Sequence, residues 1–256
     1  MLRALYTATT GMLVQRNKMD NITNNITNVD TIGYKKDYML TRSFEDVLIE
    51  RINDPNFLGA RFGATNDVGD HNWGLYVDEI VTSFGQGNLE QTNQKNELAI
   101  QGEGFFVVNT PEGERYTRAG NFRVDSEGFL VNNNGYYVQS IDGQNINVGG
   151  GEFSIDYQGN INIEGQVAGR IAVVTFDNLE GLRKAGENLY YHYQNAEPIE
   201  AQNYQVLQGY IEGSNVDVAS ETVEMISTSR AYESCYKIAQ MLDESLAKTV
   251  NDIAKF

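Results

Sequence analysis

Mostly apolar side chains recur every three or four positions along the first 29 residues of this chain. The alternating steps are those of a coiled-coil seam, which keeps one face of a helix apolar. Its members are Leu5, Ala8, Met12, Gln15, Met19, Ile22, Ile26 and Val29. Many positions between them hold Asn, Thr or Gly, which are weak helix formers. The pattern therefore predicts a helix from Leu2 to Val29 that is not stable alone.

A second stripe with similar spacing lies at the other end of the chain. Residues 216–256 contain neither glycine nor proline, so one helix of about 60 Å can form there. The stripe comprises Val216, Ala219, Val223 and Ile226 and, after a shift of phase, Tyr232, Cys235, Ala239, Leu242, Leu246, Thr249 and Ile253. We expect the two terminal helices to pair as a coiled coil and to complete their core with neighbouring copies.

This expectation defines a self-assembly seam at the two ends of the chain. Its residues are Leu5, Met12, Met19, Ile22, Ile26, Val29, Val223, Ile226, Tyr232, Leu242, Leu246 and Ile253. Asparagine within such a seam sets the register of the helices at some expense of stability. We therefore interpret the asparagines as specifying which partner is bound.

The middle of the chain has the composition of a β domain. Residues 77–215 hold most of the glycines and many tyrosines, and turn signals recur every eight to twelve residues. The stretches "VDSEGFLV" (124–131) and "IDYQGNINI" (155–163) share one plan, in which an aspartate opens a turn and a glycine closes it. The predicted fold class is α+β, with long terminal helices pairing as a coiled coil and a central all-β antiparallel domain.

Residues 31–76 are expected to connect the helical part to the β domain as an extended segment. Within it, "TRSFEDVLIERI" (41–52) predicts a short helix. The remainder is rich in glycine, yet it also contains Phe57, Phe62 and the single tryptophan, Trp73. Aromatic side chains become valuable when they are buried between surfaces, so we expect these three to anchor the connector. The helical domain would then be residues 1–30 and 216–256, and the β domain residues 77–215.

Composition argues against several classes of function. The formal net charge is −16, which disfavours nucleic acid or an anionic membrane as a partner. No apolar run approaches the roughly 18 residues of a membrane span. The one cysteine, Cys235, excludes an intrachain disulfide. His71 and His192 lie in sequences that supply no set of metal ligands, and no nucleophile motif occurs. We expect no cofactor, no metal and no catalytic residues.

Four stretches of the chain resemble one protein family. They are "NNITNVDTIGYKK" (24–36), "GNLEQTNQKNELAIQGEGFFVV" (87–108), "YTRAGNFRVDSEGFLV" (116–131) and "GYIEGSNVDVASETVEMISTSRAYE" (209–233). In this order they are similar to segments of the bacterial flagellar rod and hook proteins, and most similar to basal-body rod proteins of the distal-rod FlgG-like or proximal-rod FlgF-like type. The residues of the first stretch that match the family motif are Asn24, Asn25, Asn28, Gly33, Tyr34 and Lys35.

The resemblance implies a structural subunit of a helical tube that transmits torque from the motor to the hook. Its partners would be further copies of itself, neighbouring rod and hook proteins, the flagellar export apparatus and the bushing-ring proteins. The N-terminus lacks the apolar run and cleavage site of a signal peptide, so we expect export to the basal body without cleavage. An alternative from another class is a secreted β-domain module that binds a glycan or protein and is anchored by a helical hairpin.

Overall fold

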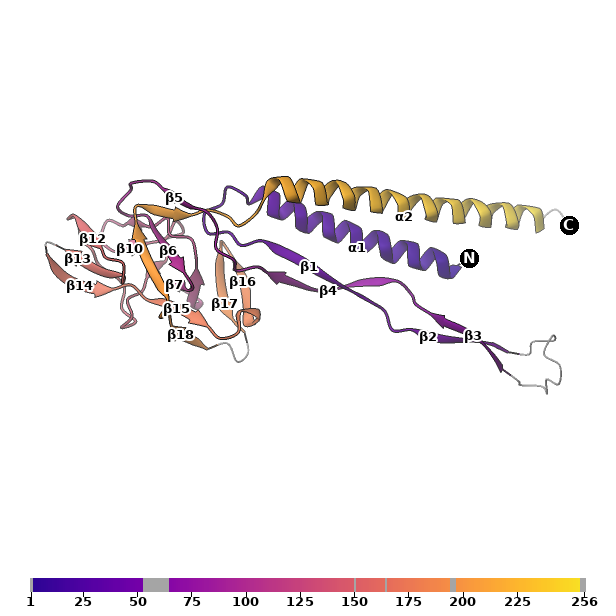
Figure 1. Cartoon of the computed structure of the whole chain (residues 1–256), viewed down its shortest axis with the longest axis horizontal. Coiled ribbons are helices and arrows are strands. Elements are labelled where there is room, and N and C mark those ends of the chain that lie inside the picture. Colours follow the sequence, from indigo (N-terminus) through magenta and orange to yellow (C-terminus); the bar gives the residue numbers. More distant parts are fainter. Residues whose placement is uncertain (1, 53–64, 150, 164, 194–196, 254–256) are drawn as a thin grey trace. The chain divides into compact units, whose positions relative to one another are not determined.

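The structure is a computed structural model that describes residues 2–52, 65–149, 151–163, 165–193 and 197–253. Its long helices are α1 (Leu2–Thr27) and α2 (Val218–Ile253), at opposite ends of the described chain (Figure 1). A short 3₁₀ turn, η1, covers Leu179–Gly181. Helices are thus present at both predicted ends, and α1 ends where the sequence turns to Asn28, Val29 and Asp30.

Twenty strands are described between the two helices. In the first half of the chain they are β1 (Asp37–Ser43), β2 (Val47–Ile52), β3 (Thr65–His71), β4 (Leu75–Thr82), β5 (Leu89–Gln91), β6 (Leu98–Gly102), β7 (Phe105–Thr110), β8 (Gly113–Thr117), β9 (Arg123–Val124) and β10 (Leu130–Val131). In the second half they are β11 (Tyr137–Val138), β12 (Phe153–Ile155), β13 (Asn160–Ile163), β14 (Gln166–Arg170), β15 (Val173–Phe176), β16 (Leu182–Gly186), β17 (Leu189–His192), β18 (Pro198–Glu200), β19 (Tyr204–Gln208) and β20 (Tyr210–Glu212).

The chain divides into two compact units. The helical unit consists of Met1–Asn24, Tyr38–Val81 and Ala219–Phe256. The β unit consists of Asn25–Asp37 and Thr82–Val218. The chain therefore passes from one unit to the other four times.

The β unit is built from antiparallel pairs around one large sheet. Its strand order is β16-β17-β8-β7-β11-β10-β9, and β15 pairs with both β7 and β18. A separate sheet has the order β12-β13-β14, and β19 pairs with β6 and β20 with β5. The predicted central antiparallel β domain is confirmed.

Strand β7 lies between two apolar clusters because its side chains alternate in direction. Phe106 and Val108 belong to the larger cluster, whereas Phe105 and Val107 belong to the smaller one. Successive residues of a strand point to opposite faces of the sheet, so an uninterrupted apolar run is what a strand buried on both faces requires. The run "FFVV" therefore forms the centre of the β unit.

The predicted turn chemistry is present in two hairpins of the β unit. Between β9 and β10, Asp125 Oδ1 accepts hydrogen bonds from the amides of Glu127 and Phe129, at 2.9 and 2.8 Å. Gly128 closes this turn with φ of +87°. Between β12 and β13, Asp156 plays the same role and Gly159 has φ of +84°. In each case an aspartate side chain replaces backbone partners that the turn would otherwise leave unbonded.

The short helix predicted for residues 41–52 is wrong. These residues contribute to β1 and form β2, and β2 pairs antiparallel with β3 from Val47 opposite His71 to Ile52 opposite Thr65. Branched side chains in "VLIERI" favour an extended backbone, and a partner strand further along the chain satisfies the hydrogen bonds of the extended chain.

The predicted coiled coil is also wrong. At the start of α2, the predicted seam residues Val223 and Ile226 are 68% and 49% exposed, whereas the polar residues Glu221 and Thr228 are 1% and 3% exposed. The covered positions of α2 run from Glu221 through Met225 and Thr228 towards the end of the helix without a shift of phase. The sequence pattern had placed the apolar stripe on the wrong face of the first turns.

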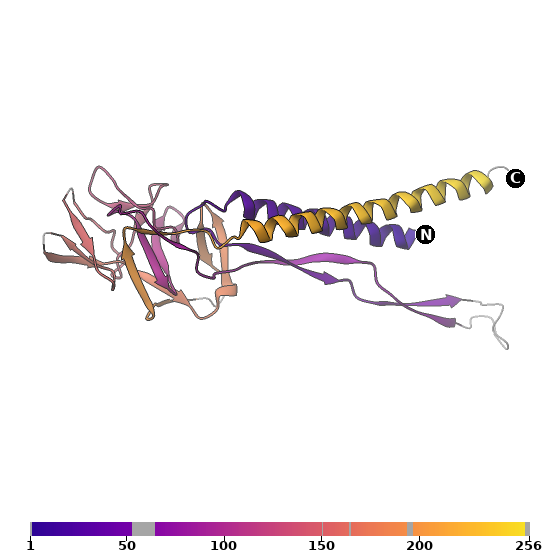
Figure 2. The same cartoon turned by 45° about the horizontal axis from the view of Figure 1, so that its top comes forward.

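The two helices nevertheless lie side by side in the helical unit, as both Figure 1 and Figure 2 show. Lys18 Nζ lies 2.8 Å from Glu224 Oε1. A Cβ atom added to Gly11 would lie 3.3 Å from Cys235 Sγ, so a glycine in α1 permits close approach to α2. The fold is therefore two terminal helices with a β-rich body, and a coiled coil between the helices is not shown.

Candidate functional site

The segment Asn25–Asp37, which follows the main part of α1, is held inside the β unit. We call it the docked segment. Its backbone is bonded to the last strand region, because Gly33 N donates to Glu212 O at 2.7 Å and Lys36 N donates to Asn215 Oδ1 at 2.7 Å. Ser83 N donates in turn to Lys36 O at 2.8 Å. Three distant parts of the sequence therefore meet along this segment.

A buried ionic triad lies beneath the docked segment and consists of Lys35, Arg118 and Glu212. Lys35 Nζ donates to Glu212 Oε1 at 2.5 Å, and Arg118 Nη1 lies 3.3 Å from Glu212 Oε2. The side chains of Lys35 and Glu212 are 0% exposed and that of Arg118 is 5% exposed. Charged groups are buried in this way only when they are paired and hydrogen-bonded.

Backbone groups complete the hydrogen bonding of the triad. Lys35 Nζ also donates to Gly85 O at 2.8 Å, and Gly87 N donates to Glu212 Oε1 at 2.9 Å. Arg118 Nη2 donates to a carbonyl of β6, at 2.9 Å. These bonds fix the loop between β4 and β5 onto the same charges.

Burial has a measurable electrostatic consequence in the triad. It lowers the pKa of Lys35 below the ordinary value, and the neighbouring Glu212 carboxylate opposes this shift. Burial likewise lowers the pKa of Arg118, again against the attraction of Glu212. The carboxylate is therefore the group that allows two cations to be buried together.

A second polar group, the Asp37 cluster, surrounds the end of the docked segment. Asp37 accepts hydrogen bonds from Thr82 Oγ1 at 2.7 Å and from Lys184 Nζ at 2.8 Å. Its amide donates to Asn25 Oδ1 at 3.0 Å, and its carbonyl accepts from Asn25 Nδ2 at 2.8 Å. Tyr34 Oη also donates to Asn25 Oδ1, and the Tyr34 ring lies 4.3 Å from Lys184 Nζ. We call the ionic triad and the Asp37 cluster together the polar junction.

Gly33 allows the docked segment to approach the β unit closely. Its φ is +69°, and a Cβ atom there would lie 2.4 Å from the backbone nitrogen of Ala119. Only glycine adopts this left-handed conformation readily and also lacks the Cβ atom for which there is no room here. Gly33 lies beyond the end of α1 at Thr27, so it serves this contact and not the helix.

Two buried donors of the junction lack a partner among the described residues. They are the Tyr190 hydroxyl and Arg118 Nε. Burial raises the pKa of Tyr190 well above its usual range, and the nearby Asp37 carboxylate adds to this effect. The hydroxyl is thus held neutral in a polar but water-poor setting.

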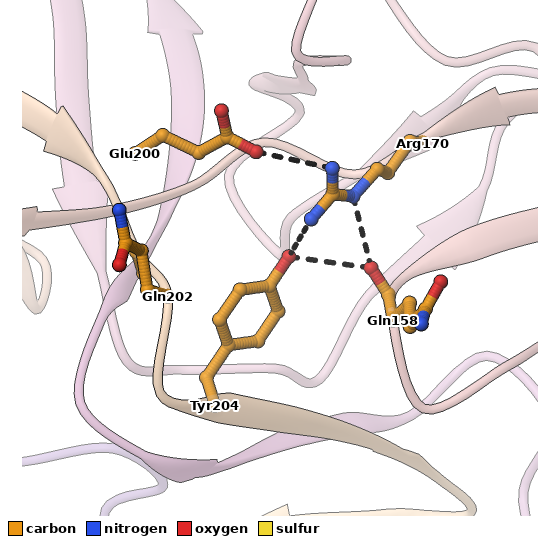
Figure 3. Close-up of a pocket in the computed structure, with 6 residues that line it drawn as sticks. Gln158, Arg170, Glu200, Gln202 and Tyr204 are labelled. Atoms are coloured by element: carbon orange, nitrogen blue, oxygen red, sulfur yellow. Dashed lines mark hydrogen bonds and ion pairs between the residues drawn. The ribbon is translucent and has the colours of Figure 1, made fainter.

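A surface hollow of about 510 Å³ lies elsewhere in the β unit. Figure 3 shows Arg170 at its centre, with Nη2 donating to Tyr204 Oη at 2.9 Å, Nε donating to Gln158 O at 3.1 Å and Nη1 3.0 Å from Glu200 Oε1. The Tyr204 hydroxyl raises the pKa of Arg170. These polar groups are bonded chiefly to one another, and the hollow pairs no nucleophile with a base. The hollow therefore has the hydrogen bonds of a stabilised protein surface and not the groups of a catalytic site.

The described residues offer neither a metal site nor a membrane-spanning helix. No group of three or more His, Cys, Asp or Glu side chains among them can hold a metal ion. None of their helices combines the length and apolar character that a bilayer crossing requires.

The structure brings three of the six predicted motif residues into the junction, namely Asn25, Tyr34 and Lys35, and Gly33 lies beside it against Ala119. Asn24 is exposed, and Asn28 Oδ1 accepts a hydrogen bond from the nearby Thr31 hydroxyl.

The predicted seam residues are scattered in their exposure. Ile22 is 3% exposed, and the half-buried ones are Leu5, Met12, Met19, Ile26, Val29, Tyr232, Leu242 and Leu246. Val223 and Ile226 are exposed, and the side chain of Ile253 lies outside the described residues.

One of the three predicted connector anchors lies within the described residues. Trp73 is 40% exposed, and its ring packs edge-on against Tyr6 of α1 and against His71, with centroids 6.2 and 5.3 Å apart. Its carbonyl accepts a hydrogen bond from Thr10 Oγ1 at 3.3 Å. Phe57 and Phe62 lie outside the described residues.

Four charged residues of the junction were not predicted from the sequence, and they are Asp37, Arg118, Lys184 and Glu212. Arg118 and Glu212 stand in "YTRAGNF" and "GYIEGSN", two stretches that carry the family resemblance. In both, a lone charge is flanked by strand and glycine residues, which is a weak signal of a buried ion. No local pattern links partners that are 177 positions apart.

Three family models match the chain in order. Residues 5–35 match "Flagella basal body rod protein", residues 99–168 match "Flagellar hook protein FlgE/F/G D1 domain", and residues 207–253 match "Flagellar basal body rod FlgEFG protein C-terminal". Each match contains one member of the ionic triad, which are Lys35, Arg118 and Glu212 respectively.

Relatives match over nearly the whole length. The chain is 37% identical to the flagellar basal-body rod protein FlgG of Bacillus subtilis, over 98% of this chain and 99% of that protein. It is 33% identical to the flagellar hook-basal body complex protein FlhO of the same organism, over 100% of both. It is 32% identical to the flagellar basal-body rod protein FlgF of Caulobacter vibrioides, over 94% of this chain and 93% of that protein. The chain belongs to the family of flagellar basal-body rod proteins.

Proposed function

We propose that this chain is a structural subunit of the flagellar basal-body rod, which polymerises into a helical tube and transmits torque from the motor to the hook. The observation that carries this proposal is the match to rod-protein models at both ends and to a hook-protein domain model in the middle, together with rod-protein relatives of nearly the same length. A polymer subunit needs shape and contacts and no reacting groups. The polar junction fits that role, because its charged groups form ion pairs and hydrogen bonds with one another and hold distant segments of the chain together.

The proposal extends to location and partners. The subunit works in the basal body and contacts other rod and hook proteins and the bushing-ring proteins. It reaches this location through the flagellar export apparatus, without cleavage of a signal peptide. We propose that residues 1–30 and 216–256 form the assembling part, that residues 31–76 connect it to residues 77–215, and that Trp73 stiffens this connector. Nothing in the structure or the comparisons favours the alternative of an anchored binding module.

We further propose that the predicted seam residues that are exposed in the single chain are covered by a neighbouring copy. Val223 is 68% exposed and Ile226 is 49% exposed, although both are branched apolar side chains. They are three positions apart and therefore lie on the same face of α2. Burial of such side chains contributes about 1.5–3 kcal/mol each. A contact of this kind is absent from the monomer and present only in the polymer.

The substitution Val223→Asp tests this function, with Val167→Asp as a matched control. Val167 in β14 is also 68% exposed, so both changes place a carboxylate at an equally open site. Each should leave the folded monomer within about 0.5 kcal/mol of the unchanged chain.

The readouts are polymer formation, measured by sedimentation and electron microscopy, and motility of cells that carry only the variant. We expect Val223→Asp to abolish both and Val167→Asp to retain both. Normal filaments from Val223→Asp would show that this face is not an assembly surface. Soluble, folded chain that never forms tubes, even without substitution and together with purified rod proteins, would contradict the function itself.

A further inference from the structure

The polar junction fastens all four passages of the chain between its two units. These passages lie between residues 24 and 25, 37 and 38, 81 and 82, and 218 and 219. Asn25, Asp37 and Thr82 are the first or last residues of the β unit at the first three of them, and all three are bonded to one another through the side chains of Asn25 and Asp37.

The fourth passage is reached through the last strand of the β unit. Asn215, three residues before the end of the unit, accepts a hydrogen bond from Lys36 N and donates to Ser83 O, at 2.7 and 2.8 Å. Glu212 lies just before it and carries the ionic triad. The amide and carbonyl of Lys36 thus bridge the second, third and fourth passages, since Ser83 N bonds to Lys36 O.

Lys35 connects the two halves of the junction. Its ammonium belongs to the triad, while its carbonyl accepts a hydrogen bond from Lys184 Nζ at 2.9 Å. Lys184 also bonds to Asp37 at 2.8 Å. Lys35 is therefore shared by the two halves, and hydrogen-bond networks that are connected through a shared residue act as a unit.

We propose that the polar junction is a cooperative coupler, in which the four passages of the chain open or stay closed together within the β unit. A force applied to the chain at one passage is then distributed over all four, because the hydrogen bonds and ion pairs of the junction connect the four segments to one another. Covalent connection alone would let each passage yield separately. This inference concerns the isolated chain and does not depend on the proposed function.

Hydrogen exchange measured by NMR on the dilute, full-length chain tests the coupler, because five backbone amides report on it. They are the amides of Gly33, Lys36, Asp37, Ser83 and Gly87, and each donates to a residue at least 12 positions away in the sequence. Amides that become exposed in one cooperative opening share one exchange free energy. Amides held by separate contacts do not.

The first variant is Thr82→Val, which keeps the shape of the side chain and removes only its bond to Asp37 Oδ1. We expect exchange at all five amides to speed up by a common factor of about ten, the effect of losing one buried hydrogen bond. The amides of β7 should keep a higher exchange free energy than these five in every variant, because their exposure requires unfolding of the whole β unit. Faster exchange at Asp37 alone, or at none of the five, would overturn the proposal.

The second variant approaches the same network from the triad. Lys35→Met removes the ammonium and keeps an unbranched apolar chain, and it should also accelerate all five amides together. Its control is Lys95→Met, which breaks an exposed ion pair with Glu152 and should leave the five unchanged. Exchange free energies of the five amides that equal those of β7 in the unchanged chain would make the junction part of the general core and would likewise overturn the proposal.

Discussion

Lys35 and Glu212 stand 177 positions apart, yet the ammonium of one lies 2.5 Å from the carboxylate of the other and both side chains are fully buried. The carboxylate serves a second cation, Arg118, at 3.3 Å. Two cations therefore depend on one anion. Because of this imbalance, substitutions of the three triad residues should differ in how much they destabilise the folded chain.

Glu212→Gln should destabilise the chain more than Lys35→Met. Without the carboxylate two cations remain buried and unpaired, a situation that costs about 3–5 kcal/mol. Without Lys35 the pair of Arg118 and Glu212 remains balanced, so the loss is closer to that of hydrogen bonds to a charged group, about 1.5–3 kcal/mol. Urea unfolding followed by circular dichroism measures both. The exposed Glu152→Gln should change nothing, and a reversed order for the two triad variants would refute this account.

Gly33→Ala should destabilise the chain severely, and Gly143→Ala separates the two reasons. Both glycines are left-handed, with φ of +69° and +74°, but a Cβ atom meets backbone at 2.4 Å only at Gly33 and open space at Gly143. Backbone strain alone costs about 1–2 kcal/mol. We expect Gly143→Ala to lower the free energy of unfolding by that amount and Gly33→Ala by about 3 kcal/mol or more. Equal effects would mean that the close approach to Ala119 is not maintained in solution.

Stability should fall as the pH rises above 10, and Tyr190 should contribute to the fall. Burial raises the pKa of Tyr190 and of Tyr116 above 10.0 in the folded chain. The unfolded chain therefore loses these protons first, so the stabilisation is complete below pH 10.0 and decreases above it. Each such proton contributes a slope of about 1.4 kcal/mol per pH unit.

The measurement is urea unfolding at several alkaline pH values, for the unchanged chain and for Tyr190→Phe. The slope of unfolding free energy against pH should be shallower in Tyr190→Phe by about 1.4 kcal/mol per pH unit, which is the contribution of one proton. Absorbance at the phenolate band should show this tyrosine ionising only on unfolding. Identical slopes for the two chains would contradict the burial of its hydroxyl.

Trp73 should report polymerisation by its fluorescence. It is the single tryptophan of the chain, and 40% of its surface is exposed although it contacts Tyr6. The dilute chain should therefore emit as a partly hydrated indole, and the emission should shift to shorter wavelength when neighbouring copies cover the ring. An unchanged spectrum on polymerisation would show that the contact with α1 is the whole role of Trp73.

Local features of the fold could be predicted from the sequence, because local chemistry decides them. The turns at Asp125 and Asp156 followed from an aspartate and a glycine at a fixed spacing. α1 followed from periodicity alone, in spite of its weak helix formers.

Features that depend on distant partners were missed or predicted wrongly. Residues 41–52 become strand because β3 and β4 pair with them, and nothing nearby in sequence announces this. In α2, the apolar residues Val223 and Ile226 suggested a seam, but the covered positions are Glu221 and Thr228. Polar residues can line a buried face when partners exist, and hydrophobic periodicity cannot detect them.

Motif residues of the candidate site could be identified, but not their role. Gly33, Tyr34 and Lys35 stood out through the family resemblance, without any indication that Lys35 is buried. The other two members of the triad, Arg118 and Glu212, are single charges in separate segments. Only the folded chain shows that one charge from each of three matched segments completes the triad.

The wide separation of the triad residues also orders events during synthesis. A chain emerging from the ribosome N-terminus first presents Lys35 early and Arg118 later, while Glu212 appears only after four-fifths of the residues have been made. Until then neither cation has its anion, and closing so long a loop is slow compared with forming hairpins. The docked segment is therefore among the last parts of the molecule to settle, and a ribosome that stops before Glu212 releases a product whose N-terminal end stays unfastened.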